Sequence, residues 1–453
     1  MSVRYLPHAP DDIRRMLEVI GVDSVDELFR PIPEAVRQKA DLDLPPAMSE
    51  MEVLEAFRRW ASMNRVPPEV ASFLGAGAYR HYVPAVVEDV LRKPEFFTAY
   101  TPYQPEVSQG TLQSIFEFQT MVCQLTGMEV ANASMYDGAT ALAEAVLMAR
   151  RIREGRHVLV ARSVHPEYRQ VLHTYLRHLD VRIEEVPWET ETGQVDRNAL
   201  QARLRDDTLA VVVQSPNALG IIEDWAAIRA TLGDHPAVRI ACFTEALSLG
   251  LLKPPGAFGF DIVVGEGQSL GLPVQFGGPH VGLMATRMEY VRRMPGRLVG
   301  VAYDRRGRRG FVLTLATREQ HIRREKATSN ICTNQTLCAL AVTVYLALLG
   351  PEGLRRLALL NAQRAHFLVR RLEAEGWERP FRGPFFNECV IRHPKAPTIW
   401  ERLLNRGIVA GLRLHRWYPE LDRDLLVCVT EMNPPDQMER LVQTIREILS
   451  SEA

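Results

Sequence analysis

Between about residue 130 and residue 285, short apolar runs alternate with helical stretches, and this alternation constrains the fold more than any other feature. The runs, rich in apolar and β-branched side chains, are His157–Ala161, Val181–Val186, Leu209–Val213, Val238–Phe243, Asp261–Gly265 and Val281–Ala285. Helical patterns such as Glu167–Leu179 and Asn198–Arg205 separate several of them. Near-continuous apolar strands that alternate with helices are typical of a mostly parallel sheet covered on both faces. We therefore predict an α/β fold.

The flanking segments predict two further parts. Residues 1–70 are expected to form a helical arm, because proline-rich connectors at Pro31–Pro33 and Asp41–Pro46 interrupt short amphipathic helices. Residues 71–330 form the predicted large α/β domain. The apolar, weakly charged stretch Asn330–Leu349 predicts a long buried helix that bridges to a small α+β domain within residues 331–453. The strands and helices expected there are Phe386–Ile391, Leu425–Val429, Pro397–Asn405 and Gln437–Leu449.

Composition excludes several classes of partner. The chain carries 54 basic and 55 acidic residues, so it offers no excess charge for nucleic acid or an anionic membrane surface. Its first residues lack the apolar core of a signal peptide, and no stretch approaches the roughly 20 apolar residues of a membrane span. The six cysteines form no Cys-x-x-Cys pair and lie mostly in apolar runs. We expect buried free thiols, a cytoplasmic protein and no metal site.

One glycine-rich segment resembles the stretch that anchors the cofactor in pyridoxal-phosphate enzymes. It runs from Gly259 to Pro273 and continues to Gly277–Pro279. Where such an enzyme carries its Schiff-base lysine, this chain has Gln268 and Ser269, and neither an amide nor a hydroxyl can replace a primary amine. The only lysines are Lys39, Lys93, Lys253, Lys326 and Lys395. None follows a strand that would face the crevice, so we predict no Schiff base on this chain.

A second candidate position is the start of the predicted helix Ala141–Arg151. The preceding segment Ala131–Thr140 contains small residues, including Ser134, and Asp137 is a plausible N-cap. An open helix N-terminus of this kind can hold a phosphate. A buried, well-capped helix explains the pattern equally well, since the carboxylates of Asp137 and Glu144 oppose an anion.

A third candidate is Glu245, which follows the predicted strand Val238–Phe243. An acidic residue at the carboxyl end of a strand can pair with the protonated pyridine nitrogen of the cofactor. The alternative is a loop carboxylate that is solvated or hydrogen-bonded locally.

Two polar segments lie outside this crevice. Tyr100–Gly110 combines two tyrosines and two prolines with hydrogen-bonding side chains, which suits a rigid binding loop or a structural corner. Thr317–Lys326 is rich in charge and forms either a solvated helix face or a surface that receives an anionic partner.

Five segments together carry a resemblance to one family: Tyr100–Gly110, Ala131–Ser134, Lys253–Gly256, Gly265–Gly271 and Thr317–Thr333. Over essentially the whole chain, the sequence resembles glycine decarboxylase, the P-protein of the glycine cleavage system. The resemblance is strongest to subunit 1, the alpha subunit of the form in which the P-protein is split into two chains.

The resemblance implies a pyridoxal-phosphate-dependent transferase of fold type I, the aspartate-aminotransferase-like fold, built from two homologous halves. In this family the second subunit carries the lysine in a His-Lys-Thr setting, which aligns with Gln268, Ser269 and Leu270. The cofactor is then bound covalently by the partner, and Ser134, Glu245 and Ser269 are degenerate cofactor positions. No catalytic residue is expected in this chain, but Tyr100 and Tyr103 are candidates for reaching the partner's site.

The implied reaction decarboxylates glycine and transfers the aminomethyl group to the lipoyl arm of the H-protein. The assembly would be a heterodimer or a dimer of heterodimers, inactive without the lysine-bearing subunit. Two alternatives remain open from the sequence. One is a regulatory or scaffolding pseudoenzyme that binds the catalytic subunit without shaping its active site. The other is an independent enzyme of the same fold that uses Glu245 or another group without pyridoxal phosphate.

Overall fold

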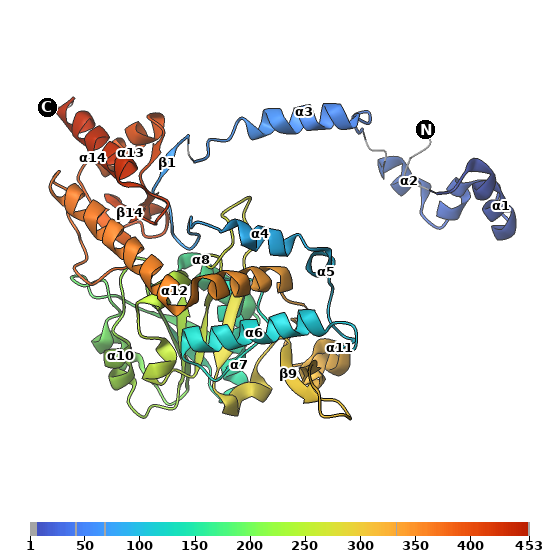
Figure 1. The fold of residues 1–453 in the computed structure, drawn as a ribbon, viewed down its shortest axis with the longest axis horizontal. Coiled ribbons are helices and arrows are strands. Elements are labelled where there is room, and N and C mark those ends of the chain that lie inside the picture. The colour runs from blue at the N-terminus through green and yellow to red at the C-terminus, as the bar shows by residue number, and fades with distance from the viewer. Residues whose placement is uncertain (1–6, 41–42, 68, 332, 452–453) are drawn as a thin grey trace. The chain divides into compact units, whose positions relative to one another are not determined.

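The computed structural model describes residues 7–40, 43–67, 69–331 and 333–451 (Figure 1). The chain divides into two compact units, Met1–Arg65 and Val66–Ala453. The finer boundaries expected at residues 70 and 330 stay predictions.

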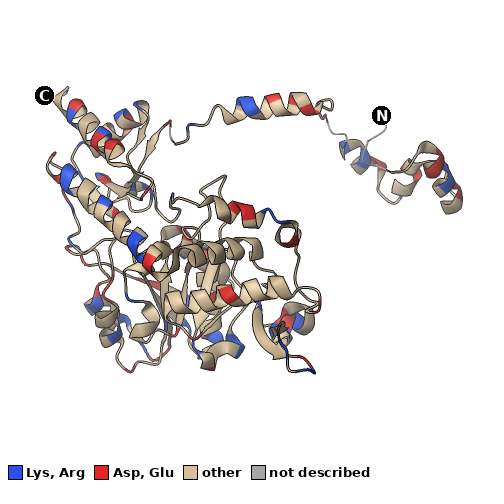
Figure 2. Ribbon diagram, in the orientation of Figure 1, with Lys and Arg blue, Asp and Glu red and all other residues tan. Residues whose placement is uncertain are grey.

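The N-terminal unit consists of short helices with little core of its own. Its elements are α1 (Pro10–Ile20), η1 (Val25–Phe29), α2 (Glu34–Arg37), η2 (Gln38–Ala40) and α3 (Glu50–Ala61). Helix α3 begins with a capping box in which the Ser49 backbone N–H donates to the Glu52 carboxylate at 2.7 Å. Figure 2 shows acidic residues toward the start of α3 and basic residues toward its end, an order that complements the helix dipole. Ala56 is the one buried residue of this helix, so its aromatic side chains Phe57 and Trp60 remain exposed.

A seven-stranded sheet forms the centre of the second unit. Its strands are β2 (Val130–Ala131), β3 (His157–Ala161), β4 (Arg182–Val186), β5 (Thr208–Gln214), β6 (Val238–Phe243), β7 (Ile262–Glu266) and β8 (Gly282–Thr286). The order is β2-β8-β7-β6-β5-β3-β4; the pairs from β7 to β4 are parallel, and β8 and β2 join in antiparallel orientation. Strands β3, β5 and β7 are buried along their whole length. The predicted α/β fold with a mostly parallel sheet is confirmed.

Helices connect and cover these strands. Four helices lie between consecutive strands from β2 to β6: α7 (Gly138–Ile152), α8 (Pro166–Leu176), α9 (Arg197–Arg203) and α10 (Trp225–Leu232). The segments before β2 are α4 (Ala85–Leu91), α5 (Pro94–Phe97) and α6 (Gln109–Thr126). After β8 come η5 (Met288–Arg293), the hairpin of β9 (Leu298–Tyr303) and β10 (Arg309–Thr314), and the short helices η6 (Ala316–Arg318), α11 (Gln320–Arg323) and η7 (Arg324–Lys326).

Helix α12 (Thr336–Glu373) links two hydrophobic cores (Figure 1). It contains the predicted bridging helix but extends well beyond Leu349, across a break at Gly350 (φ 60°, ψ −179°) that is followed by Pro351. Side chains from Cys338 to Ala358 belong to the core of the large sheet, and those from Ala365 to Leu372 to a second core.

By length and composition alone, α12 is apolar enough to cross a membrane, contrary to the expectation from the sequence. Core helices of soluble proteins meet the same criteria, so one such helix is weak evidence for a membrane.

The C-terminal part is α+β, as expected. Its elements are β11 (Glu388–Arg392), α13 (Ala396–Asn405), β12 (Ile408–Val409), β13 (Leu412–Arg413), η8 (Leu414–Arg416), β14 (Asp424–Cys428) and α14 (Pro435–Ser450). Strand β1 (Ala71–Ser72) pairs in parallel with β12, and Ala71 and Phe73 lie in the second core. The chain therefore starts this unit beside its C-terminal elements and only then runs to the large sheet, passing the carboxyl ends of β6 and β7 through the segment 75–82.

Candidate functional site

The carboxyl ends of β6 and β7 bring the candidate crevice residues together. These two strands are parallel neighbours, so Thr244 and Glu245 after β6 lie beside Gln268 and Ser269 after β7. In doubly wound sheets this edge is the usual place for a ligand. The four side chains are buried, Gln268 with 0% and Ser269 with 1% relative exposure.

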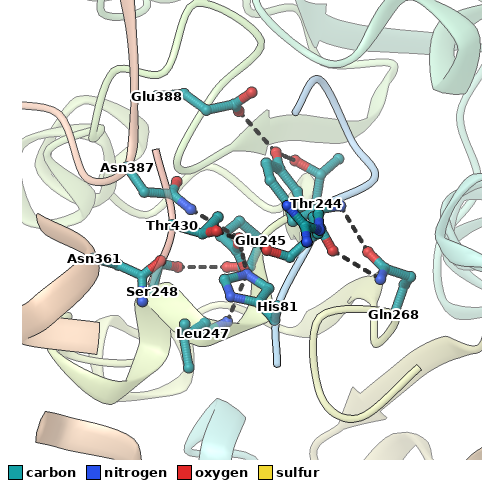
Figure 3. A network of polar contacts seen from close by, with 12 residues as sticks. His81, Thr244, Glu245, Leu247, Ser248, Gln268, Asn361, Asn387, Glu388 and Thr430 are labelled. Carbon is teal, nitrogen blue, oxygen red and sulfur yellow. Dashed lines mark hydrogen bonds and ion pairs between the residues drawn. The ribbon is translucent and has the colours of Figure 1, made fainter. Parts of the chain in front are cut away.

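The amide of Gln268 is bonded to the backbone of the segment 75–82. Its oxygen accepts a hydrogen bond from Tyr79 N at 2.8 Å, and its nitrogen donates to Tyr79 O at 2.9 Å (Figure 3). The same nitrogen also donates to Leu272 O at 2.7 Å. The side chain therefore connects the loop after β7 to the segment 75–82 by hydrogen bonds. The neighbouring Ser269 hydroxyl has no hydrogen-bond partner among the described residues.

Glu245 is paired inside the chain. Its carboxylate accepts hydrogen bonds from His81 Nε2, Leu247 N and Asn387 Nδ2, each at 3.0 Å (Figure 3). The other ring nitrogen of His81, Nδ1, lies 2.9 Å from a carboxylate oxygen of Glu431. Both ring nitrogens face carboxylate acceptors, so the ring is an imidazolium that donates twice. Glu245 is therefore neither solvated nor bonded only within its own loop, because His81 and Asn387 lie far from it in the sequence. Its role as a degenerate cofactor position stays a prediction.

Opposing effects act on the charge of His81. Burial favours the neutral ring, but the charges and hydrogen bonds of Glu245 and Glu431 outweigh it and raise the pKa of His81 to about 10. Burial likewise works against the ionised form of Glu431, yet the His81 contact dominates and lowers the pKa of that carboxyl to about 2. The three residues form a carboxylate–imidazolium–carboxylate triad between the end of β6 and the segment after β14.

The start of α7 is also occupied by a group of this chain. Asp137 caps the helix as predicted, accepting from Thr140 N at 2.8 Å. The carboxylate of Glu266 accepts from Gly138 N at 2.9 Å, and His280 Nδ1 lies 3.4 Å from the same oxygen. The second oxygen of Glu266 accepts from three backbone N–H groups, those of Gly267, Gln268 and Val281. An internal carboxylate thus fills the place where a phosphate would bind.

These observations decide whether pyridoxal phosphate fits this crevice. Glu245, the acid that would pair with the pyridine nitrogen, is bonded to His81. The helix N-terminus that would bind the phosphate is bonded to Glu266. The position of the Schiff-base lysine is occupied by Ser269. The segment 75–82 is packed too tightly to yield easily: His165 Nε2 donates to Ala76 O at 2.9 Å, and a Cβ at Gly75 would lie 2.3 Å from Glu388 Oε1. The residues present do not fit the cofactor.

A second polar cluster surrounds Tyr103. Arg297 Nη2 donates to the Tyr103 hydroxyl at 3.2 Å, and its guanidinium carbon lies 5.5 Å from the centre of the tyrosine ring. His321 packs edge-on against the same ring with centroids 5.8 Å apart. Tyr103 is 52% exposed and Tyr100 84% exposed, so this loop presents aromatic surface outward.

Ser134 belongs to the Tyr103 cluster and not to the crevice of Glu245. Its hydroxyl accepts from Asn334 Nδ2 at 3.1 Å and from Gln335 N at 3.0 Å, and Arg297 Nη1 lies 3.4 Å from Asn334 Oδ1. Ser134 therefore holds the start of α12 beside the loop. Its role as a degenerate cofactor position stays a prediction.

Sequence reasoning missed His81, Tyr79, Glu266 and Arg297. The run Gly75–Tyr82, with two glycines and closely spaced aromatic and histidine side chains, was the available signal for the first two. Glu266 and Arg297 carry no local signal, because their importance comes from partners far along the chain. Within the described residues, no group of three or more His, Cys, Asp or Glu side chains is arranged to hold a metal ion.

Comparison with known proteins gives consistent matches over nearly the whole chain. The family profile of the glycine cleavage system P-protein matches residues 3–445. "Probable glycine dehydrogenase (decarboxylating) subunit 1" from Desulfitobacterium hafniense is 50% identical, covering 98% of this chain and 100% of that protein. The protein of the same description from Thermomicrobium roseum is 52% identical, with 98% and 99% covered.

Solved structures agree with this relationship. A crystal structure of glycine decarboxylase (P-protein) of the glycine cleavage system, in inhibitor-bound form, superposes with a TM-score of 0.88 at 44% identity, covering 98% of this chain and 100% of that one. A sphingosine-1-phosphate lyase from Burkholderia pseudomallei, at 17% identity and a TM-score of 0.66 over 92% of this chain and 94% of that one, shares the fold. The architecture is thus that of the pyridoxal-phosphate enzymes of fold type I. The chain belongs to the P-protein family of the glycine cleavage system.

Proposed function

We propose that this chain is the non-lysine subunit of a two-chain glycine decarboxylase. The partner subunit holds pyridoxal phosphate on its lysine, and the assembly decarboxylates glycine and passes the aminomethyl group to the lipoyl arm of the H-protein in the cytoplasm. One observation carries the proposal: each anchor of this chain's own crevice is bonded to a residue of the same chain or lacks the required amine. The full-length similarity to proteins described as subunit 1 supports it.

Exposed apolar side chains support the presence of a partner. Phe97, Tyr100 and Val107, in and before the Tyr100–Gly110 loop, are 65%, 84% and 79% exposed. Large apolar groups gathered in one segment are typical of a protein interface. In the proposed assembly this loop contacts the lysine-bearing subunit, and Tyr103 with Arg297 completes the wall of its active site.

Reconstitution tests the division of labour. The isolated chain should show no visible absorbance from bound pyridoxal phosphate and no exchange of glycine carboxylate with bicarbonate. Both should appear when the lysine-bearing subunit is added. Mass measurement of the product would distinguish a heterodimer from a dimer of heterodimers. A borohydride-reducible adduct on the isolated chain would contradict the proposal.

Tyr103→Phe tests the role of the loop in the assembled complex. The variant keeps the ring beside Arg297 but loses the hydroxyl, so turnover should fall about tenfold or more while assembly stays intact, a change of about 1.4 kcal/mol in transition-state stabilisation. The matched control is Tyr303→Phe, which removes an exposed hydroxyl on β9 and should change nothing. Unchanged turnover of the Tyr103 variant with normal assembly would favour a scaffolding role.

A further inference from the structure

A cavity outside both polar clusters is lined by basic residues. It has a volume of about 470 Å³ and lies between the end of α7, η5 and the segment 315–328. Its charged lining residues are Arg151, Arg292, Arg293, Arg318, Arg323 and Lys326. The remaining lining residues are threonine, leucine and alanine, so no carboxylate faces this space.

The basic groups of the cavity form no direct ion pair within the described part of the chain. None of the six basic groups has a carboxylate oxygen within 4.0 Å there. Arg318 is buried and donates to the backbone carbonyls of Leu315, Met294 and Gly296, which are neutral acceptors. Glu319 acts on its charge without a direct ion pair. Arg151 donates through Nε to Arg293 O at 3.2 Å, and its buried Nη2 has no partner.

The pKa of Arg151 is lowered by burial and by the neighbouring positive charges. Burial lowers it first, the nearby Glu144 raises it, and the charges of Arg293, Arg318 and Arg150 lower it further, to about 10. Elsewhere the fold does neutralise arginine, as where Arg392 donates twice to Asp424 at 2.9 and 3.0 Å. Glu144 near Arg151 and Glu319 near Arg318 offset only part of this charge, and like charges that are incompletely neutralised raise the energy of the folded state. An anionic ligand would remove that cost.

The chemistry of the lining groups favours a phosphate over a single carboxylate. Several guanidinium forks converging on one space suit an anion with three or more oxygens and a double charge. The hydroxyls of Thr317 and Thr328 add neutral donors. The volume lies within the range of about 300–1,000 Å³ of small-molecule sites, so it has room for more than the phosphate group itself.

We propose that the cavity lined by Arg151, Arg292, Arg293, Arg318, Arg323 and Lys326 is a binding site for the phosphate group of a small phosphorylated molecule. The site shares no lining residue with the Tyr103 cluster or the crevice at Glu245. It goes beyond the proposed function and does not depend on it, because the ligand binds to this chain directly.

Binding of inorganic phosphate and of glycerol 3-phosphate to the full chain tests the site, with sodium chloride at equal ionic strength as reference. The double variant R292Q/R293Q removes two exposed charges and should raise the dissociation constant at least tenfold for both ligands. R305Q/R306Q, on the exposed β9–β10 turn, removes the same charge and should leave it unchanged.

Melting temperatures measured without phosphate show that each variant is folded, and the ligands should raise that of the wild type through mass action. Tighter binding of glycerol 3-phosphate than of phosphate would support the proposal, and equal or weaker binding would restrict the site to free phosphate and overturn its assignment to a phosphorylated molecule. Binding no stronger than that of chloride, or equal affinity of wild type and R292Q/R293Q, would overturn the proposal. Neither outcome bears on the reconstitution of glycine decarboxylase activity.

Discussion

Replacing His81 by leucine will lower the free energy of unfolding by about 3–5 kcal/mol. Leucine fills a similar volume, but it leaves Glu245 and Glu431 buried without their shared cation. Their side chains are 1% and 9% exposed, so water cannot replace the imidazolium. Urea denaturation followed by circular dichroism measures the change. His178→Leu, at an exposed position, is the control and should change stability by less than about 0.5 kcal/mol.

The same triad predicts how stability depends on pH. Because the pKa of His81 is raised from 6.5 to about 10 by folding, the folded chain holds a proton that the unfolded chain releases between these values. The stabilisation is complete below pH 6.5 and is lost as the pH rises through about 10, with a slope of at most about 1.4 kcal/mol per pH unit. The lowered pKa of Glu431 acts in the opposite window: its contribution is present above pH 4.5 and is lost as the pH falls toward about 2.

The difference between wild type and His81→Leu isolates this effect from other titrating groups. It should shrink steadily between pH 6.5 and 10. A difference that stays constant over this range would show that His81 is neutral in the folded chain. The carboxylate–imidazolium–carboxylate assignment would then be wrong.

The sheet was predictable because its signal is local. Each predicted strand run of this sheet is a strand, and no end is shifted by more than one residue. Short apolar runs between helical stretches are typical of buried strands in a mostly parallel sheet, although β8, the last of them, pairs in antiparallel orientation. Asp137 was predictable for the same reason: an N-cap needs only the residues of the first helical turn. The break at Gly350 and the continuation of α12 to Glu373 were missed, because the sequence after Pro351 turns charged on its exposed face and no longer resembles a buried helix.

The contents of the crevice were not predictable, because they depend on contacts between distant residues. His81 and Glu245 are 164 residues apart in the chain, and Tyr79 and Gln268 are 189 apart. From the sequence, Glu245 and the start of α7 are equally compatible with an empty site and a filled one. The path of residues 75–82, set by β1 pairing with β12 and by the large sheet, fills the position beside Glu245, and Glu266 at the end of β7 fills the start of α7.

Ser269→Lys will not create a pyridoxal-phosphate enzyme, although it restores the missing amine. The pyridine nitrogen would need Glu245, which holds His81, and the phosphate would need the start of α7, which holds Glu266. Absorbance and borohydride reduction with added cofactor should therefore show no Schiff base at residue 269. The new ammonium also enters a position that is 1% exposed, which should lower the free energy of unfolding by about 2 kcal/mol or more.

Ser269→Ala is the matched control: the hydroxyl has no hydrogen-bond partner among the described residues, so its loss should change stability by less than about 1 kcal/mol. A reducible Schiff base on Ser269→Lys would mean that the segment 75–82 leaves the crevice readily, and the absent lysine alone would then explain why this chain depends on a partner for its cofactor.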